Sequence, residues 1–191
     1  FNYNVINKKL PNIKFKIITA LSMFYDLDNP NAFLKDASKL LDNNGVLLIE
    51  HADLLSIFKS KIFDTFCHEH LEYYSSKVII DMVKKHNLRV FDHKFNNING
   101  GSSQYYICHE DSKYKLKKSV SEVLKMEKKF NLEKINTFKK FYNSIHKIKK
   151  KLLKKINSIL KSNKIIHGYG ASTKGNVLLQ YFGINKNQIN L

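Results

Sequence analysis

The stretch Phe15-Lys16-Ile17-Ile18-Thr19-Ala20-Leu21 is apolar and rich in β-branched residues, which predicts a buried strand. Asp28-Asn29-Pro30 follows it as a turn and helix-start signal, and a helix with one apolar face is expected next. Asp42-Asn43-Asn44-Gly45 is expected to end that helix. Val46-Leu47-Leu48-Ile49-Glu50 then predicts a second buried strand, so this part of the chain has the order strand, helix, strand.

The next elements indicate how the sheet ends. An amphipathic helix is expected with Val78, Ile79, Met82 and Val83 facing inward. Arg89–Phe95 and Ser103–Cys108 predict two strands, and the glycine-bearing stretch between them predicts an antiparallel hairpin. Strand–helix–strand units imply a parallel sheet, and the hairpin implies one antiparallel strand inserted near its edge. The fold class is therefore α/β, with the C-terminal part of a Rossmann-like sheet in residues 1–110.

Length and composition fit a globular protein. The chain has 191 residues, and at roughly 100–200 residues per domain this is one domain or two small ones. It is 43% hydrophobic and 26% charged, which favours a packed core over disorder. No apolar run approaches the ~20 residues of a membrane span, so no membrane partner is expected. The two cysteines are too few for a disulfide scaffold, so a cytoplasmic location is expected.

The formal net charge of +17 raises the question of nucleic acid. All but one of the 33 Lys and Arg residues are lysines, and Arg89 is the exception. Nucleic-acid readers use Arg for bidentate contacts with phosphate and guanine, which Lys cannot make. We therefore expect a solvated lysine coat and no nucleic-acid partner.

Residues 111–164 predict a lysine-rich helical connector. From Ile135 to Leu160 the apolar residues recur in steps of three, four and one, which is the pattern of a helix with a single apolar stripe. The stripe is expected to pack on a neighbouring element, and a membrane-surface helix or another subunit remain alternatives.

Residues 165–191 predict the start of a second α/β domain. Lys164–His167 is expected to be a strand, Gly168–Asn176 a glycine-rich turn, and Val177–Phe182 a helix. Such a turn can offer backbone N–H groups and a helix N-terminus to a phosphate. Its glycines lack the full spacing of a dinucleotide-binding loop, so tight strand-to-helix packing is the alternative.

The densest chemical cluster runs from Asp64 to Ser75. It contains the sequence Cys67-His68-Glu69-His70, and it follows a strand that ends where open α/β sheets bind their ligands. Cys67, His68 and His70 are possible zinc ligands. However, adjacent residues rarely converge on one ion, so no metal site is expected. A histidine with a neighbouring glutamate is suited to removing a proton near neutral pH. Histidines that only bond loop carbonyls are the structural alternative.

Four motifs in order resemble the S-adenosylmethionine-dependent C-methyltransferases that act on nucleotide-linked sugars. They are Ser22–Pro30, Asp64–Tyr74 with its His-Glu-His sequence, Asn99–Ser102, and Gly168–Asn176. The resemblance implies methylation of a carbon of an NDP-4-keto-deoxyhexose. It also implies three parts: a zinc-binding domain, a central Rossmann-like methyltransferase domain and a C-terminal α/β domain that completes the nucleotide-sugar pocket. This chain would then begin within the central domain and be inactive by itself, with zinc expected only in the missing N-terminal domain.

The resemblance also assigns roles to residues. His70 would be the base that forms an enolate, Glu69 would hold a sugar hydroxyl or orient the imidazole, and His68 and Tyr73 would line the pocket. The family often has Tyr where this chain has Cys67, so a tyrosine contact is not carried over. The residues expected to contact S-adenosylmethionine are Ala20, Leu21, Ser22 and Met23. Those expected to contact the nucleotide sugar are Asn99, Gly100, Gly101, Ser102, Tyr169, Ser172 and Lys174.

Two other function classes compete with this interpretation. One is a nucleotide-binding, dehydrogenase-like module that uses Gly168–Asn176. The other is a non-catalytic interaction protein that uses the lysine-rich helix. The sequence leaves open which sugar and carbon are methylated, the pathway of the product, and the oligomeric state.

Overall fold

The chain divides into two compact units in the computed structural model, which describes residues 1–189. The first, the sheet unit, comprises Phe1–Ser60 and Leu71–Glu133, and the second, the helical unit, comprises Lys61–His70 and Lys134–Leu191. The domain boundaries expected near residues 110 and 164 stay predictions.

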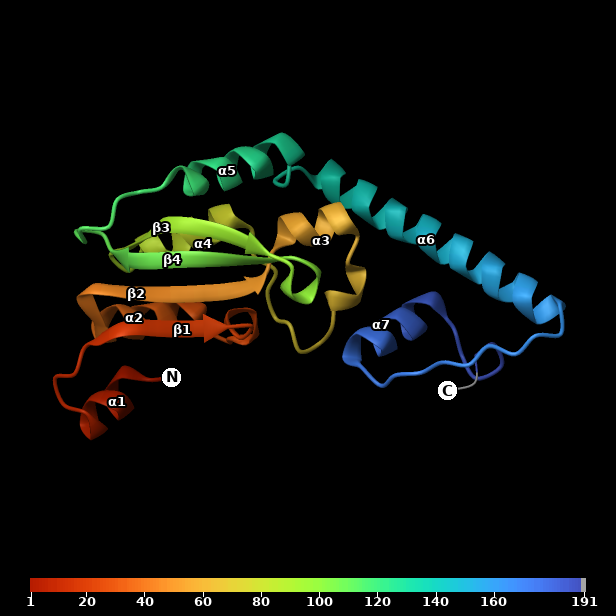
Figure 1. Ribbon diagram of the computed structural model, residues 1–191, viewed down its shortest axis with the longest axis horizontal. Helices are drawn as coiled ribbons and strands as arrows, with labels where there is room; N and C mark the ends of the chain where they lie inside the picture. Colours follow the sequence, from red (N-terminus) through yellow and green to blue (C-terminus); the bar gives the residue numbers. More distant parts are fainter. Residues whose placement is uncertain (190–191) are drawn as a thin grey trace. The chain divides into compact units, whose positions relative to one another are not determined.

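The sheet unit contains a four-stranded mixed sheet with the order β1-β2-β4-β3. Its strands are β1 (Phe15–Leu21), β2 (Leu41–Ala52), β3 (Leu88–Asn96) and β4 (Ser102–His109). β1 and β2 are parallel, whereas β4 is antiparallel to both β2 and β3. The predicted α/β class, the parallel pair and the inserted antiparallel strand are therefore confirmed (Figure 1).

The stretch Asp42–Gly45 corrects one expectation, because it belongs to β2 and not to a turn after the helix. Phe15 pairs with Leu41 and Ile17 pairs with Val46, so the register shifts and the intervening residues of β2 bulge out of the ladder. Gly45 fits this bulge because an added Cβ would lie 2.7 Å from the Phe15 carbonyl oxygen. The Asp, Asn and Gly residues here form the irregular start of a strand. Local composition does not distinguish such a start from a turn.

Helices cover the sheet and fill the connections. They are α1 (Tyr3–Lys9), α2 (Pro30–Leu40), α3 (Leu54–Ser60), α4 (Ser76–Lys84) and α5 (Lys118–Phe130), with short 3-10 turns η1 (Phe24–Asp26) and η3 (Ile98–Gly100). The Asn29 side chain caps α2 by accepting a hydrogen bond from the Ala32 N–H at 2.9 Å. In α4, Val78 is 45% exposed and Ile80 is buried, so the inward face differs from the one expected.

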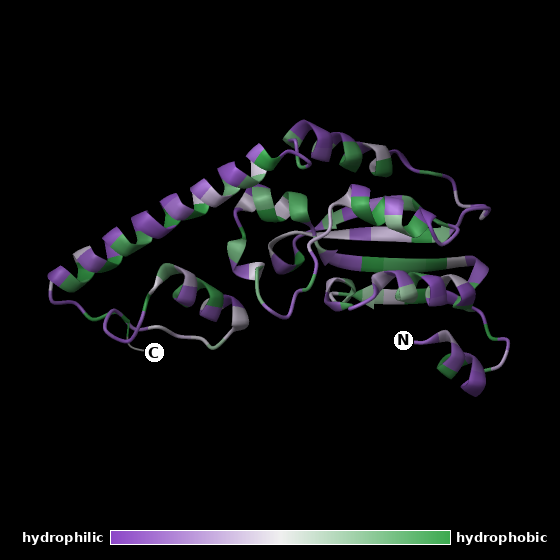
Figure 2. Cartoon of the chain, turned by 180° about the vertical axis from the view of Figure 1, so that it is seen from behind, coloured by the Kyte–Doolittle hydropathy of each residue, from purple (hydrophilic) through white to green (hydrophobic). Residues whose placement is uncertain are grey.

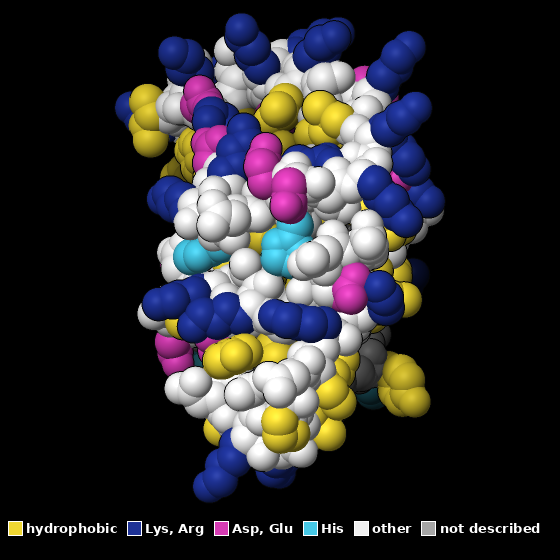
Figure 3. All heavy atoms as spheres, turned by 90° about the vertical axis from the view of Figure 1, so that its left-hand side faces the viewer, with side chains coloured by type: hydrophobic (Ala, Val, Ile, Leu, Met, Phe, Trp, Pro, Cys, Tyr) yellow, Lys and Arg dark blue, Asp and Glu magenta, His cyan; other side chains and the backbone are white. Residues whose placement is uncertain are grey.

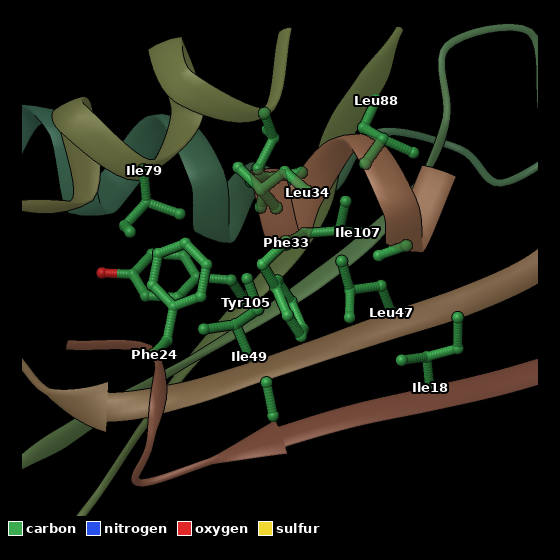
Figure 4. Packing of buried hydrophobic residues seen from close by; sticks show 14 of the residues in the cluster. Ile18, Phe24, Phe33, Leu34, Leu47, Ile49, Ile79, Leu88, Tyr105 and Ile107 are labelled. Atoms are coloured by element: carbon green, nitrogen blue, oxygen red, sulfur yellow. The ribbon is translucent and has the colours of Figure 1, made fainter. Parts of the chain in front are cut away.

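The core of the sheet unit lies between the sheet and helices α2 and α4. Figure 4 shows Ile79 of α4, Phe33 and Leu34 of α2, and Phe24 packed over sheet residues that include Tyr105 and Ile49. These side chains are almost fully buried. At about 25 cal/mol per Å² of buried apolar surface, such packing is the main stabilising contribution to this unit.

The helical unit is built from η2 (Phe63–Thr65), α6 (Ile135–Lys161) and α7 (Thr173–Phe182). Figure 2 shows apolar and polar residues alternating along α6, as expected of one apolar stripe. The buried residues of its hydrophobic cluster are Ile145, Ile156, Phe182 and Ile184. The lysine-rich segment is thus helical as predicted, and it forms two helices because Asn131 ends α5 in the left-handed conformation.

The strand expected at Lys164–His167 is not formed. Within residues 1–189, only His167 of this stretch forms an isolated bridge, and Ile165 is 70% exposed. A strand requires a neighbouring ladder to satisfy its backbone groups, and the described part of the helical unit offers none. The predicted helix after it does form, and it starts at Thr173, before Val177.

Candidate active site

The carboxyl ends of β1 and β2 lie side by side and carry the first group of predicted residues (Figure 1). Ser22 follows β1 and lies in the left-handed region, with φ of 50°, and its N–H donates to the Glu50 carbonyl at 2.8 Å. Such a conformation in a non-glycine residue is costly and is often found at functional sites. Leu21 is half exposed, Met23 packs at the margin of the core, and the Ala20 side chain is buried.

The segment Leu71–Ser75 is fixed to this edge by backbone hydrogen bonds. The N–H groups of Leu71 and Glu72 both donate to the Tyr25 carbonyl at 3.1 Å. The Tyr74 carbonyl accepts from the Leu54 N–H, also at 3.1 Å. Tyr73, a predicted pocket residue, is half-buried between these anchors.

The loop Asn99–Ser102 joins the same edge. Asn99 has φ of 56°, and Gly101 has φ of 137° with its carbonyl accepting from the Asp53 N–H at 3.4 Å. Asn99 and Gly100 are exposed, whereas Gly101 and Ser102 are buried. The Ser102 hydroxyl donates to the Ile98 carbonyl at 2.9 Å, so it holds the loop closed.

Glu50 is a residue that the sequence analysis did not assign to the site. Its carboxylate accepts from the Asn96 side-chain amide at 2.8 Å and from the Gln104 amide at 2.6 Å. It therefore ties β2 to both strands of the hairpin at the base of the loop. A lone glutamate at the end of an apolar run gives no sequence signal for this role.

His51 and its neighbours were also missed. His51 is fully buried, stacks on the Tyr105 ring at 5.4 Å and meets the Tyr74 ring edge-on at 5.7 Å. Burial lowers the pKa of His51 to about 4 and raises the pKa of the Asp53 carboxyl. Burial, aided by the Glu72 charge, raises the pKa of Tyr74 to about 12. At neutral pH this cluster thus holds a neutral imidazole and a neutral phenol.

A second buried histidine lies on the neighbouring strand. The His93 ring nitrogen Nε2 lies 2.9 Å from the Ser103 hydroxyl, and its ring lies 5.2 Å from that of Tyr105. Burial lowers its pKa to about 4, against the opposing effect of Asp92. The two histidines therefore flank Tyr105 without carrying charge at neutral pH.

The His-Glu-His sequence lies in the helical unit. His68 and Glu69 are exposed and His70 is half-buried. The Thr65 hydroxyl lies 3.4 Å from Nδ1 of His70, and the His70 N–H donates to the Cys67 carbonyl at 3.3 Å. Thr65 was not assigned a role from the sequence. Across residues 1–189, no group of three or more His, Cys, Asp or Glu residues is arranged to hold a metal ion.

The glycine-rich stretch also lies in the helical unit. Tyr169 is fully exposed, and the Ser172 hydroxyl caps α7 by accepting from the Gly175 N–H at 3.1 Å. Lys174 is half-buried in the first turn of α7. The predicted site residues are thus divided: the cofactor group, Tyr73 and the Asn99–Ser102 loop are in one unit, and His68–His70 with the α7 group are in the other.

Figure 3 shows Lys and Arg side chains spread over the face that it draws, interspersed with acidic and apolar ones. Over the described residues, none of the helices has the length and hydropathy needed to span a bilayer.

Comparison with known proteins gives two sequence matches. Residues 97–191 match the model of the C-methyltransferase C-terminal domain. The chain is also 25% identical over 174 residues to the C-methyltransferase NovU of Streptomyces niveus, a match that covers 91% of this chain. The chain spans 41% of the length of that relative.

Solved structures give weaker likenesses. One is magnesium protoporphyrin IX methyltransferase (ChlM) of Synechocystis PCC 6803 with bound SAH, at 12% identity and a TM-score of 0.41, over 52% of this chain and 47% of that one. Another is an S-adenosylmethionine-dependent methyltransferase of Clostridium acetobutylicum, at 14% identity and a TM-score of 0.40, over 51% and 59%. Because both TM-scores lie below 0.5, neither likeness bears on function. Residues 97–191 are thus similar to a C-methyltransferase C-terminal domain, and most of the chain is similar to a C-methyltransferase.

Proposed function

We propose that this chain is part of an S-adenosylmethionine-dependent C-methyltransferase that methylates a carbon next to the ketone of an NDP-4-keto-deoxyhexose. The observation that carries the proposal is the match of residues 97–191 to a C-methyltransferase domain. The match to NovU over 91% of the chain supports the same reaction class. The His-Glu-His motif supports a mechanism that begins with proton removal from carbon.

His70 is proposed as the base. A carbon next to a ketone is acidic enough for a positioned imidazole to remove its proton and leave an enolate. The Thr65 hydroxyl, 3.4 Å from Nδ1, helps to orient the ring so that Nε2 faces the substrate. Glu69 is exposed and is proposed to hold a sugar hydroxyl, while His68 and Tyr73 line the pocket.

The end of β1 fits part of a cofactor contact. S-adenosylmethionine, when bound, supplies an electrophilic methyl group to the enolate carbon. Leu21 offers an exposed apolar side chain next to the left-handed Ser22, and Met23 adjoins them. Ala20 is buried, so its contact would come from the backbone.

The nucleotide sugar is proposed to contact two groups of residues. Asn99 and Gly100 present an exposed loop whose conformation Gly101 and Ser102 maintain. In the helical unit, the exposed Tyr169 offers a ring face, and Lys174 offers a positive charge to phosphate. Ser172 is already bound to the Gly175 N–H, so it would act by shaping the start of α7.

Replacing His70 tests this mechanism in the full-length protein. We expect His70→Asn to lower kcat about 10²–10⁴-fold, the usual contribution of a general base, with the affinity for S-adenosylmethionine unchanged. It should also abolish solvent deuterium exchange at the sugar carbon in the absence of the methyl donor, because the proton is removed before methyl transfer. Exchange is measured by NMR or mass spectrometry.

His86→Asn is the matched control. His86 follows α4 and bonds the Asn31 side chain at 2.9 Å, so its loss should leave the exchange rate unchanged. An exchange rate in His70→Asn equal to wild type would remove His70 from the role of base and make His68 the next residue to test.

A further inference from the structure

Three buried polar atoms at the carboxyl end of β2 have no hydrogen-bond partner. They are Nε2 of His51, Oδ2 of Asp53 and the hydroxyl of Tyr74, on side chains that are 0%, 1% and 5% exposed. In the described part of the chain, the Ser112 hydroxyl is the one further buried side-chain group without a hydrogen-bond partner. Most buried polar atoms in proteins are hydrogen-bonded, so three unpaired atoms at one end of a strand require an explanation.

The three side chains are neighbours. The rings of His51 and Tyr74 are 5.7 Å apart at an interplanar angle of 63°. The Leu54 N–H donates to the Tyr74 carbonyl at 3.1 Å, which fixes Tyr74 next to the Asp53–Leu54 peptide. All three residues therefore lie at the same end of β2. The Asn99–Ser102 loop is next to them, because its Gly101 carbonyl accepts from the Asp53 N–H.

The donors and acceptors of these residues follow from their other bonds. Nδ1 of His51 lies 2.9 Å from the Ala52 carbonyl oxygen, which can only accept, so Nδ1 carries the proton and Nε2 is an acceptor. Oδ1 of Asp53 accepts from the Ser56 N–H at 2.9 Å, which leaves Oδ2 unpaired. The Tyr74 hydroxyl has a proton to donate. One donor and two acceptors match a water molecule, which has two protons to donate, and a hydroxyl group satisfies the donor and one of the acceptors.

Packing alone would favour different residues here. A buried polar atom without a partner costs roughly 1–3 kcal/mol, whereas a phenylalanine at position 51 or 74 would keep the ring and avoid that cost. Sites that violate such rules are typically functional.

We propose that His51, Asp53 and Tyr74 form a hydroxyl-binding site at the carboxyl end of β2, in which Tyr74 donates to the bound oxygen. A water molecule would donate to both His51 and Asp53, whereas a sugar hydroxyl, which has one proton, would donate to one of them. The hydroxyl belongs either to the sugar of the substrate or to an internal water molecule. The sugar source rests on the proposed function, whereas the water source does not.

The test uses ring-preserving variants of the full-length protein: His51→Phe, Tyr74→Phe and the double variant. His109→Phe is the matched control, because His109 is also a sheet histidine facing a backbone carbonyl, Leu41 O at 3.3 Å, but at the opposite end of β2. Calorimetry measures the affinity for TDP-6-deoxyglucose and for TDP. Thermal unfolding without ligand measures the melting temperature of each variant.

A sugar hydroxyl is indicated if His51→Phe and Tyr74→Phe each weaken TDP-6-deoxyglucose by about fivefold to thirtyfold, the worth of one hydrogen bond, and leave TDP unchanged. A water molecule is indicated if two conditions hold. Both affinities are unchanged, and the melting-temperature shift of the double variant differs from the sum of the two single-variant shifts by more than about 2 °C. Either result supports the site.

Unchanged affinities together with additive shifts overturn the proposal. The unfolding measurements need no substrate, so they remain decisive even if the wild-type protein binds no sugar nucleotide. In that case the proposed function fails, and non-additive shifts still support a hydroxyl-binding site. If a variant at position 51 does not fold, Asp53→Asn combined with Tyr74→Phe completes the same cycle.

Discussion

Gly101 shows how one residue without a side chain fixes the Asn99–Ser102 loop. Its φ of 137° lies in a region that other residues rarely adopt, and an added Cβ would lie 2.7 Å from Cβ of Ser56. The loop can therefore approach the first turn of α3 closely. That approach places the Gly101 carbonyl within reach of the Asp53 N–H.

Gly101→Ala is expected to destabilise the protein by about 1–3 kcal/mol through backbone strain, with a further cost from the contact with Ser56. Gly170→Ala is the matched control, because Gly170 has φ of 140° but nothing within 4 Å of an added Cβ. Urea unfolding of both variants separates the two effects. Equal losses of stability would show that crowding against Ser56 contributes nothing.

His51 predicts a pH dependence of stability. Its pKa falls from 6.5 to about 4 on burial, so the unfolded chain binds the proton more tightly than the folded one. Its contribution of about 3 kcal/mol is complete above pH 6.5 and is lost as the pH falls toward 4. The raised pKa values of Asp53 and Glu127 act in the opposite direction, because each folded carboxyl retains its proton to higher pH.

We therefore expect the urea midpoint of the protein to fall between pH 7 and pH 5, and to fall less in His51→Phe. Both proteins contain the same carboxyl groups, so the difference between their pH dependences gives the contribution of His51. A His51→Phe slope equal to that of wild type would show that His51 is not protonated on unfolding in this range.

At the scale of elements, α5 holds α4 in place through one buried carboxylate. Glu127 accepts from the backbone N–H groups of Ser76 at 2.5 Å and of Lys77 at 3.1 Å, which are first-turn groups of α4. The Ser75 hydroxyl accepts from Val78, so the start of α4 is capped from two sides. The segment Leu71–Ser75, which carries Tyr73, ends at this cap.

Glu127→Ala should cost about 1–3 kcal/mol, because it leaves the buried Ser76 N–H and the partly buried Lys77 N–H without their carboxylate partner. Glu122→Ala, an exposed position of the same helix, should change stability by no more than about 0.5 kcal/mol. Urea unfolding gives both values. A Glu127→Ala variant as stable as Glu122→Ala would mean that water replaces the carboxylate.

At the scale of the whole molecule, the +17 charge is distributed without an arginine cluster. Some lysines have structural partners: Lys149 donates to the Tyr181 carbonyl at 2.7 Å and lies over the Tyr181 ring at 5.3 Å. Lys150 and Lys151 on the same helix are exposed. The lysine-rich helix therefore combines packing with a solvated face.

We expect the protein to bind duplex DNA no tighter than about 10⁻⁶ M at physiological salt, as nonspecific charge attraction does. Replacing Lys150 and Lys151 with Ala should weaken this binding equally for all sequences. Fluorescence anisotropy with two unrelated duplexes provides the measurement. Tight binding of one duplex, lost in the double variant, would contradict the expectation.

The sequence by itself indicated β1, β2 and the two strands of the hairpin, and their order along the chain. β1, β2 and the hairpin follow from apolar runs and turn residues, which act over a few neighbours and can be read locally. The strand boundaries that depend on pairing with a neighbouring strand could not be predicted from local sequence. Asp42–Gly45 joined β2 because β1 lies beside it, and Lys164–His167 formed no strand because the described residues offer it no neighbouring ladder.

The candidate site divides in the same way. The His-Glu-His sequence, the Asn99–Ser102 loop and the turn before α7 stand out as dense local patterns, so the sequence indicated them. Glu50, His51, Asp53 and Tyr105 carry no local pattern, and only the tertiary structure decided their surroundings. Burial by distant strands is what lowers the His51 pKa and leaves its Nε2 unpaired, because desolvation depends on which segments fold over a side chain.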